Sequence, residues 1–186
     1  MNRGAGWVTE VRHTADLSAP TRRAVRELLA AAYGEDFSDD DWDHALGGLH
    51  TLAWLGGRLI GHAALVQRTL LVGDAPRRVG YLEAMAVHPA WQRRGVGRTL
   101  LRQVNAQVTR AYDFGALSTS DEGLGLYQAG GWRVWRGPLR VMTPAGVRET
   151  PEEGGGVLVY APAGTLDAAQ EEGAPLTCEF RRGDVW

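Results

Sequence analysis

The run Gln92-Arg93-Arg94-Gly95-Val96-Gly97 constrains the fold of this chain more than any other stretch. It follows the apolar segment 79–89, which has strand character, and it leads into a segment with an apolar residue at every fourth position, as in an amphipathic helix. A glycine-rich turn at a helix start exposes backbone N–H groups at the positive end of the helix dipole. The two glycines let a bulky anion approach the backbone, and the arginines add positive charge. The run therefore predicts a pyrophosphate-binding turn between a strand and a helix.

This turn differs from two familiar phosphate-binding motifs. The chain contains neither G-x-x-x-x-G-K-[ST] nor G-x-G-x-x-G, so it is predicted to be neither a P-loop protein nor a dinucleotide-binding Rossmann protein. The turn has no lysine and no hydroxyl placed to hold a metal ion, so no metal is implied.

Hydrophobic periodicity predicts a mixed α/β fold, of the α+β kind, with one domain over 1–186. Strands are expected at 7–13, in a hairpin over 50–72 that turns at Gly56-Gly57, and at 79–89, 114–120, 132–142 (strand, turn, strand), 157–161 and within 175–186. Helices are expected at 18–33, within 34–48, at 94–112 and at 121–131, the first two capped by Ser18 or Thr21 and by Ser38. Turns or loops are expected at 74–78 and 150–156, with residues 1–6 frayed.

Composition narrows the class of protein. The chain has 186 residues, is 44% hydrophobic and carries a net charge of −2, which suits one domain with a core and does not favour nucleic acid as a partner. The single cysteine, Cys178, excludes an internal disulfide, and the five histidines are scattered without H-E-x-x-H spacing. Without a signal peptide or an apolar 18-residue run, the expectation is a soluble, cytoplasmic protein that does not contact the membrane.

Three motifs together carry a resemblance to a known family. The Q-x-x-G-x-G run at 92–97, the preceding AVHPAW at 86–91 and the later LYQAGGW at 126–132 resemble the GCN5-related N-acetyltransferases. The resemblance implies a mixed, mostly antiparallel sheet with splayed central strands and flanking helices, acetyl-CoA as the cofactor, and Tyr127 as the acid that faces the CoA sulfur. The cofactor-binding residues that it implies are Met85, Ala86, Val87, Gln92, Arg93, Arg94, Gly95, Val96, Gly97, Arg98 and Thr99.

Further blocks along nearly the whole chain resemble the aminoglycoside 2'-N-acetyltransferases. They include the acidic segment 34–50, GYLEAMAV at 80–87 and the terminal RRGDVW at 181–186. This resemblance implies acetyl transfer to the 2'-amine of aminoglycoside antibiotics by direct attack, antibiotic resistance, and a homodimer. It also implies that residues 175–186 complete the substrate pocket, where the terminal carboxylate of Trp186 takes part. The substrate-binding residues that it implies are Asp36, Asp41, Glu83, Ala84, Ser118, Glu153, Asp184 and Trp186. The family usually has an aspartate where this chain has Glu153, which puts that contact in doubt.

The chemistry of acetyl transfer also indicates candidate catalytic residues. Transfer to an amine needs a donor to the developing oxyanion, a base for the amine and an acid for the thiolate. Glu83, in an apolar strand just before the proposed oxyanion site at 85–87, is the candidate base, acting through water, or a binder of substrate ammonium. The alternatives are a solvent-facing carboxylate for Glu83 and core packing for Tyr127. Cys178 could carry an acetyl group, or it is an inert buried thiol.

Six acidic residues within nine positions predict a cationic substrate. They are Glu35, Asp36, Asp39, Asp40, Asp41 and Asp43. Several carboxylates around one cavity attract a polycation and steer its approach. The alternative is a solvated helix face in which some of the acids favour the helix N-terminus.

Several readings remain open from the sequence. The enzyme could acetylate another small amine, with aminoglycosides as a side activity, or it could act on protein lysines or N-termini. A CoA-binding sensor without turnover is the non-enzymatic alternative. The preferred aminoglycosides, the oligomeric state and the route of the proton, through Glu83 or through the terminal carboxylate, are not determined by the sequence.

Overall fold

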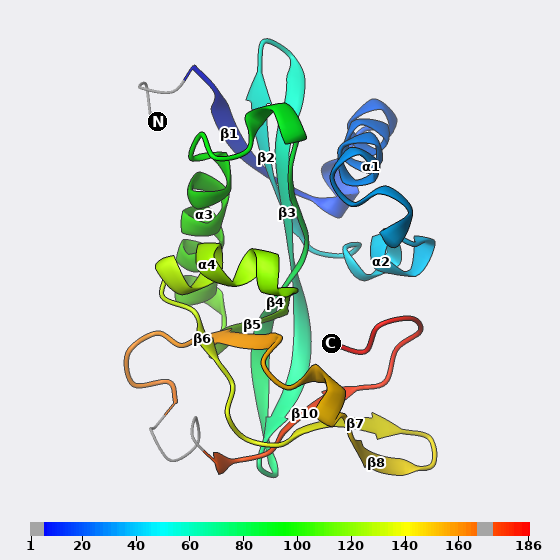
Figure 1. Cartoon of the computed structure of the whole chain (residues 1–186), viewed down its shortest axis with the longest axis vertical. Helices are drawn as coiled ribbons and strands as arrows, with labels where there is room; N and C mark the ends of the chain where they lie inside the picture. Colours follow the sequence, from blue (N-terminus) through cyan, green and yellow to red (C-terminus); the bar gives the residue numbers. More distant parts are fainter. Residues whose placement is uncertain (1–5, 167–172) are drawn as a thin grey trace. The chain divides into compact units, whose positions relative to one another are not determined.

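A computed structural model describes residues 6–166 and 173–186 and confirms the mixed α/β class (Figure 1). The α-helices are α1 (Ala19–Tyr33), α2 (Asp39–His44), α3 (Val96–Ala111) and α4 (Asp121–Ala129). The strands are β1 (Val8–His13), β2 (Leu49–Leu55), β3 (Arg58–Val72), β4 (Ala75–Val87), β5 (Phe114–Ser118), β6 (Arg133–Val134), β7 (Leu139–Thr143), β8 (Gly146–Glu149), β9 (Val157–Tyr160) and β10 (Leu176–Glu179). Short 3-10 helices lie at Thr14–Asp16, Gly34–Asp36, Pro89–Trp91 and Pro151–Glu153.

The chain forms two compact units. The first unit is Met1–Val66 with Leu82–Val104, and the second is Gln67–Tyr81 with Asn105–Trp186. Strands β3 and β4 and helix α3 contribute residues to both units.

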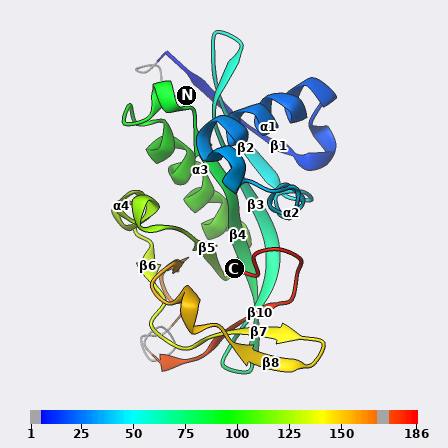
Figure 2. The same cartoon turned by 45° about the vertical axis from the view of Figure 1, so that its right-hand side comes forward.

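The first unit packs helices on both faces of β2 and β3. Strand β2 pairs antiparallel with β1 and with β3. Buried side chains of α1, α2 and β2, including Leu29, Trp42 and Leu52, form one apolar cluster on one face. On the opposite face, Gly61 of β3 lies so close to α3 that an added Cβ would come within 2.8 Å of Val96. Figure 2 shows this arrangement, with α1 and α2 across the strands from the start of α3.

The strands of the second unit follow the order β6-β9-β5-β4-β3-β10-β7-β8. The pairs β5–β9, β6–β9, β7–β8 and β10–β3 are antiparallel, whereas β4–β5 and β10–β7 are parallel. The sheet is therefore mixed and mostly antiparallel, as the sequence predicts. Among the described residues, the β4–β5 ladder runs only from Val79 to Tyr81 on β4, although β4 continues to Val87.

Both predicted helix caps are confirmed. Ser18 accepts a hydrogen bond from the Thr21 backbone N–H, and Ser38 accepts one from the Asp41 N–H. Within the described part of the chain, no helix is long and apolar enough to cross a membrane.

One predicted boundary was wrong, and one strand was missed. Residues 75–78 belong to β4 rather than to a turn, because Gly73, with φ +60°, and Asp74 complete the turn by themselves. Strand β8 was not expected, since all four of its residues are exposed and its sequence shows no apolar alternation.

Candidate active site

The phosphate-binding turn predicted from the sequence connects the end of β4 to α3 in the first unit. Its backbone is in the left-handed region at Arg93 (φ +58°) and at Gly95 (φ +88°), and α3 begins at Val96. Gln92 donates from its side chain to the Val87 carbonyl over 3.3 Å, which ties the turn back to β4. The Arg94 guanidinium lies 4.9 Å from the ring centre of Trp91.

This turn fits a pyrophosphate. Residues 92–95 are exposed, and an added Cβ at Gly95 would meet nothing within 4 Å, so the space before the helix is open. The first N–H groups of α3 have no partners within the helix, and the exposed guanidiniums of Arg93, Arg94 and Arg98 supply positive charge. All of the predicted cofactor-binding residues, from Met85 to Thr99, lie on one continuous piece of the first unit.

Strand β4 has an unusual conformation just before this turn. Ala84 has φ +48°, which non-glycine residues rarely adopt. The Ala84 carbonyl oxygen lies 2.8 Å from Nδ1 of His62, and the Tyr33 hydroxyl donates to the Met85 carbonyl oxygen. Side chains of β3 and α1 thus bind two successive carbonyls of β4. We call Ala84 the reversed residue because of its positive φ. Glu83, the candidate base, is half-buried and immediately precedes it.

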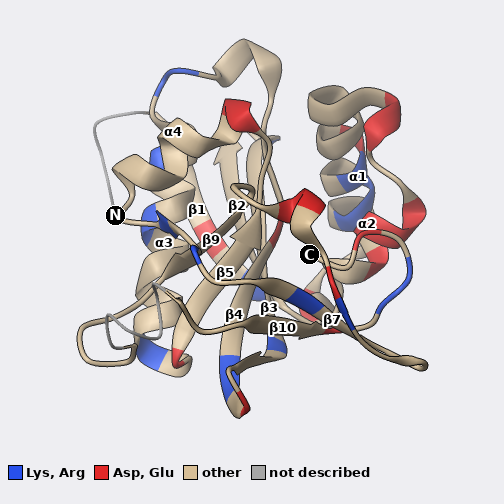
Figure 3. Cartoon of the chain, turned by 60° about the horizontal axis from the view of Figure 1, so that its bottom comes forward, with Lys and Arg blue, Asp and Glu red and all other residues tan. Residues whose placement is uncertain are grey.

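The acidic segment of the first unit divides into carboxylates with structural partners and carboxylates without them. Figure 3 shows acidic residues gathered around α2 and the segment that leads into it. The Asp41 carboxylate accepts hydrogen bonds from the Ser38 N–H and hydroxyl, both at 2.8 Å, in a capping box. Asp39 forms an ion pair with Arg26. Within the described residues, no hydrogen bond or ion pair occupies Asp36, which is exposed.

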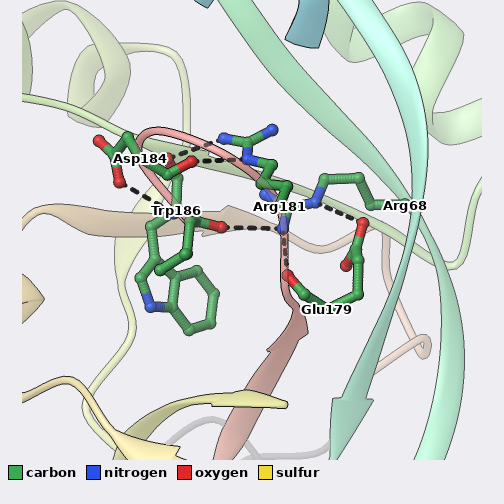
Figure 4. A network of polar contacts seen from close by, with 6 residues as sticks. Arg68, Glu179, Arg181, Asp184 and Trp186 are labelled. Atoms are coloured by element: carbon green, nitrogen blue, oxygen red, sulfur yellow. Dashed lines mark hydrogen bonds and ion pairs between the residues drawn. The ribbon is translucent and has the colours of Figure 1, made fainter. Parts of the chain in front are cut away.

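The C-terminal tail, residues 180–186, belongs to the second unit and is held there by several polar contacts (Figure 4). Trp186 is 2% exposed, and its indole Nε1 donates to the Thr150 hydroxyl over 2.9 Å. Its backbone N–H donates to the Asp184 carboxylate over 3.0 Å. Arg181 donates to main-chain oxygens of both Asp184, at 2.7 Å, and Trp186, at 3.0 Å.

A buried arginine fastens the same tail to β10. The Arg68 side chain is 3% exposed and stacks on the Tyr81 ring at 4.4 Å. It donates to the Glu179 carboxylate over 2.9 Å and to the Val185 carbonyl over 2.8 Å. Because a single rigid guanidinium binds both a side chain of β10 and the main chain beside Trp186, the tail has a defined path.

The predicted substrate residues of the second unit gather around the 3-10 helix Pro151–Glu153. The segment that follows this helix contacts the end of β5. The backbone N–H of Thr119 donates to the Gly156 carbonyl over 3.0 Å. An added Cβ at Gly156 would lie 3.7 Å from the Ser118 hydroxyl oxygen. Burial, followed by the carboxylates of Asp184 and Glu152, raises the pKa of Glu153. The carboxylates of Glu153 and Asp184 therefore share a region of negative potential.

Tyr127 is buried in α4, where its ring meets the Trp132 ring edge-on at 6.2 Å. The Trp132 indole donates to Asn105 of α3 over 2.9 Å, which fixes the aromatic pair against that helix. The ring of Tyr127 therefore packs in the core.

The structure also shows residues that sequence reasoning missed. Thr150, Arg181 and Arg68 position the tail, and His50 and His62, which the sequence presents as scattered, lie in contact. A signal for Arg181 was its place beside the acidic, aromatic chain end, and a signal for the histidines was their place within strands that are otherwise apolar.

A strand with a left-handed residue, followed by an anion-binding helix start, fits the binding of a CoA thioester by an acyltransferase, as the resemblance implies. The model of the acetyltransferase (GNAT) family matches residues 17–127, and the chain belongs to this family. GNAT acetyltransferases use acetyl-CoA as the acetyl donor, so the fold, enzyme class and cofactor predicted from the sequence are confirmed.

One relative matches almost the whole chain. It is the aminoglycoside 2'-N-acetyltransferase of Mycolicibacterium fortuitum, 45% identical over 178 residues, which covers 94% of this chain and 89% of the relative. An acyl-CoA N-acyltransferase from Pseudomonas aeruginosa superposes with a TM-score of 0.60 at 16% identity, over 83% of this chain and 99% of that one. Escherichia coli ElaA superposes with a TM-score of 0.59 at 16% identity and the same coverage. These two structures support the fold alone.

Proposed function

We propose that this enzyme transfers the acetyl group of acetyl-CoA to the 2'-amine of aminoglycoside antibiotics by direct attack and thereby gives resistance to them. One observation carries the proposal, which is the 45% identity over 94% of the chain to an aminoglycoside 2'-N-acetyltransferase. Acetylation would remove one positive charge and one hydrogen-bond donor from the drug.

We assign recognition of a polycationic sugar to the carboxylates that the resemblance implies for the substrate. In the first unit we assign Asp36, which has no competing partner among the described residues, and Asp41, whose carboxylate also caps α2. In the second unit we assign Glu153 and Asp184, whose mutual repulsion a bound ammonium would relieve. The Ser118 hydroxyl and the main-chain oxygen of Trp186 supply further acceptors.

The acetyl-CoA thioester supplies an activated acetyl group when it is bound. Glu83 accepts, through a water, the proton that the attacking amine loses, and the nitrogen then forms a bond to the acetyl carbon. Backbone N–H groups at 85–87 donate to the oxygen on which negative charge develops. Tyr127 donates its hydroxyl proton to the sulfur as the carbon–sulfur bond breaks, and solvent returns that proton. We assign proton removal to Glu83 rather than to Trp186, because Arg181 already donates to the Trp186 main-chain oxygen.

The finer sequence predictions belong to this proposal. We assign the chain to one acetyltransferase domain that acts in the cytoplasm and that assembles as a homodimer. Sedimentation velocity tests the homodimer, and a monomer across the working concentration range would contradict it. The main alternative keeps the fold and cofactor but makes another small amine the native substrate.

The decisive experiment measures thiol release from acetyl-CoA with aminoglycosides that carry a 2'-amine and with matched drugs that carry a 2'-hydroxyl, such as kanamycin A. We expect turnover only with the first set. Turnover with both sets would move acetylation to another position, and no turnover with either would reject the antibiotic substrate. Glu83→Gln and Tyr127→Phe should each lower kcat by about 100-fold or more, within the contribution typical of general acid–base groups, while acetyl-CoA binding is retained.

A further inference from the structure

A buried chain of hydrogen bonds in the first unit ends at the reversed residue of β4. The Thr14 hydroxyl lies 2.8 Å from Nε2 of His50, and Nδ1 of His50 lies 2.9 Å from Nε2 of His62. Nδ1 of His62 lies 2.8 Å from the carbonyl oxygen of Ala84. The chain thus crosses from the 3-10 helix after β1, through β2 and β3, to β4. None of these four residues belongs to the phosphate-binding turn.

The two histidines are neutral because they lie in the apolar core. Both are fully buried, and their rings lie 5.2 Å apart on the same face of β2 and β3. Trp42 of α2 lies 6.5 Å from the His50 ring. Burial is the main cause that lowers the pKa of His50 to about 4 and that of His62 to about 3. At neutral pH each ring therefore has one N–H group and one lone pair.

The Ala84 carbonyl, at which this series of hydrogen bonds ends, sets the direction of each bond in the series. Ala84 O can only accept, so the proton of His62 is on Nδ1 and its Nε2 accepts from Nδ1–H of His50. Nε2 of His50 then accepts from the Thr14 hydroxyl. The longer contact of that hydroxyl with the Gly48 carbonyl, at 3.2 Å, cannot use the same proton. Both rings are thus fixed as Nδ1–H tautomers.

This series of hydrogen bonds holds the backbone in place and does not carry a proton to the reacting groups. A carbonyl oxygen cannot pass a proton onward, so the histidines are not a relay to the amine. They fix the carbonyl of a residue whose φ of +48° is sparsely populated and needs support from its surroundings. Tyr33 binds the next carbonyl, that of Met85. The carboxylate proposed as base precedes Ala84 directly, and the N–H groups proposed for the oxyanion follow it directly.

We propose that His62, held in place by His50 and Thr14, is a positioning residue for acetyl transfer that maintains the reversed backbone at Ala84 and so directs both Glu83 and the N–H groups at 85–87 toward the reacting acetyl group. Its role in turnover rests on the proposed function. Its effect on the backbone of β4 does not, and the two can be tested separately.

Three variants and one control separate positioning from stability. His62→Leu removes both hydrogen bonds, His62→Gln keeps one donor and one acceptor, and Thr14→Val removes only the far end of the chain. Val25→Ala is the control, because Val25 is buried in the apolar cluster of α1, α2 and β2 and its side chain has no hydrogen-bonding group. We expect His62→Leu to lower kcat by about 100-fold, as a misplacement of about 1 Å can do, with little change in the Kd for CoA. His62→Gln should retain most of the wild-type kcat, and Thr14→Val should lower kcat least of the three variants.

The same assays contain results that would overturn the proposal. If His62→Leu lowers the thermal midpoint while kcat per folded enzyme stays unchanged, as expected for Val25→Ala, then the histidine is only structural. If the acid limb of the kcat–pH profile between pH 5 and 9 disappears in His62→Gln, then the histidine titrates in the reaction and is not a positioning residue.

A measurement without turnover tests the backbone effect. The amide resonance of Met85 should shift when acetyl-CoA, but not CoA, is added to the wild-type enzyme, and this difference should vanish in His62→Leu. If the wild-type enzyme acetylates no drug in the panel, the proposed function fails, whereas this comparison still decides the role of His62. Equal Met85 shifts with both ligands in the wild type would overturn the inference, as would an Nε2–H tautomer of either histidine in nitrogen-15 spectra.

Discussion

The indole Nε1 of Trp186 donates a hydrogen bond to the hydroxyl of Thr150 over 2.9 Å, and both residues are buried. The contact fastens the last residue of the chain beside the 3-10 helix that carries Glu153. This hydrogen bond therefore links two segments that are assigned to the substrate.

Thr150→Val should separate these segments. A buried indole N–H without a partner costs about 1–3 kcal/mol, so the free energy of unfolding should fall by that amount. We expect the KM for the aminoglycoside to rise more than the KM for acetyl-CoA, because the tail and Glu153 serve the sugar. Urea denaturation and steady-state kinetics provide the two readouts. Thr109→Val, at an exposed hydroxyl on α3, is the control and should change neither.

Gly95→Ala should weaken the phosphate-binding turn through the backbone alone. An added Cβ meets open space, but φ is +88°, a region that costs an L-residue about 1–2 kcal/mol. We expect a loss of stability of that size and a weaker Kd for CoA in calorimetry. Gly125→Ala is the matched control, because Gly125 lies inside α4 without a positive φ and its added Cβ also meets nothing within 4 Å. That substitution should stabilise by about 0.5–1 kcal/mol, so equal effects of the two would contradict our account of the turn.

Glu153→Gln should make the enzyme more stable and weaken its binding of the drug. Burial and the carboxylates of Asp184 and Glu152 raise the pKa of Glu153 above its ordinary value of 4.5. A raised folded-state pKa means that the folded state binds the proton more tightly, so stability is lost as the pH rises through the folded pKa. At pH 7 the glutamine variant without substrate should therefore have the higher thermal midpoint, and the difference should vanish below pH 4.5.

The same variant should bind the polycationic drug more weakly, which raises its KM. Glu27→Gln, at an exposed glutamate of α1, is the control and should leave both the midpoint and KM unchanged. A Glu153→Gln enzyme with a lower midpoint at pH 7 would show that the carboxylate makes a favourable contact instead.

Cys178 should be inert. It is fully buried in β10, and burial is the main cause that raises the pKa of its thiol to about 11, so the nucleophilic thiolate is scarce at neutral pH. Iodoacetamide should not modify the native enzyme, and Cys178→Ala should retain kcat. An acetylated Cys178 trapped by mass spectrometry would replace direct attack with a two-step transfer.

The sequence by itself determined the features whose causes lie within a few residues. The glycine-rich turn, the start of α3 and the caps at Ser18 and Ser38 follow from backbone conformations and hydrogen bonds that span about one helical turn. The mixed α/β class followed from hydrophobic periodicity in the same way. The cofactor and substrate residues listed by resemblance stay predictions, although the turn that carries much of the cofactor set has the geometry expected of it.

Only the tertiary structure decided which distant side chains meet. His50 and His62 come into contact because β2 and β3 pair with a particular register, and His62 lies within hydrogen-bond distance of the carbonyl oxygen of Ala84, a residue with a positive φ. Trp186 finds Thr150, which lies 36 residues earlier in the chain. These partners depend on strand register and on the path of the tail, and a shift of one residue in register turns every side chain of a strand to the other face. Such contacts leave no local periodicity, so no reading of neighbouring residues could predict them.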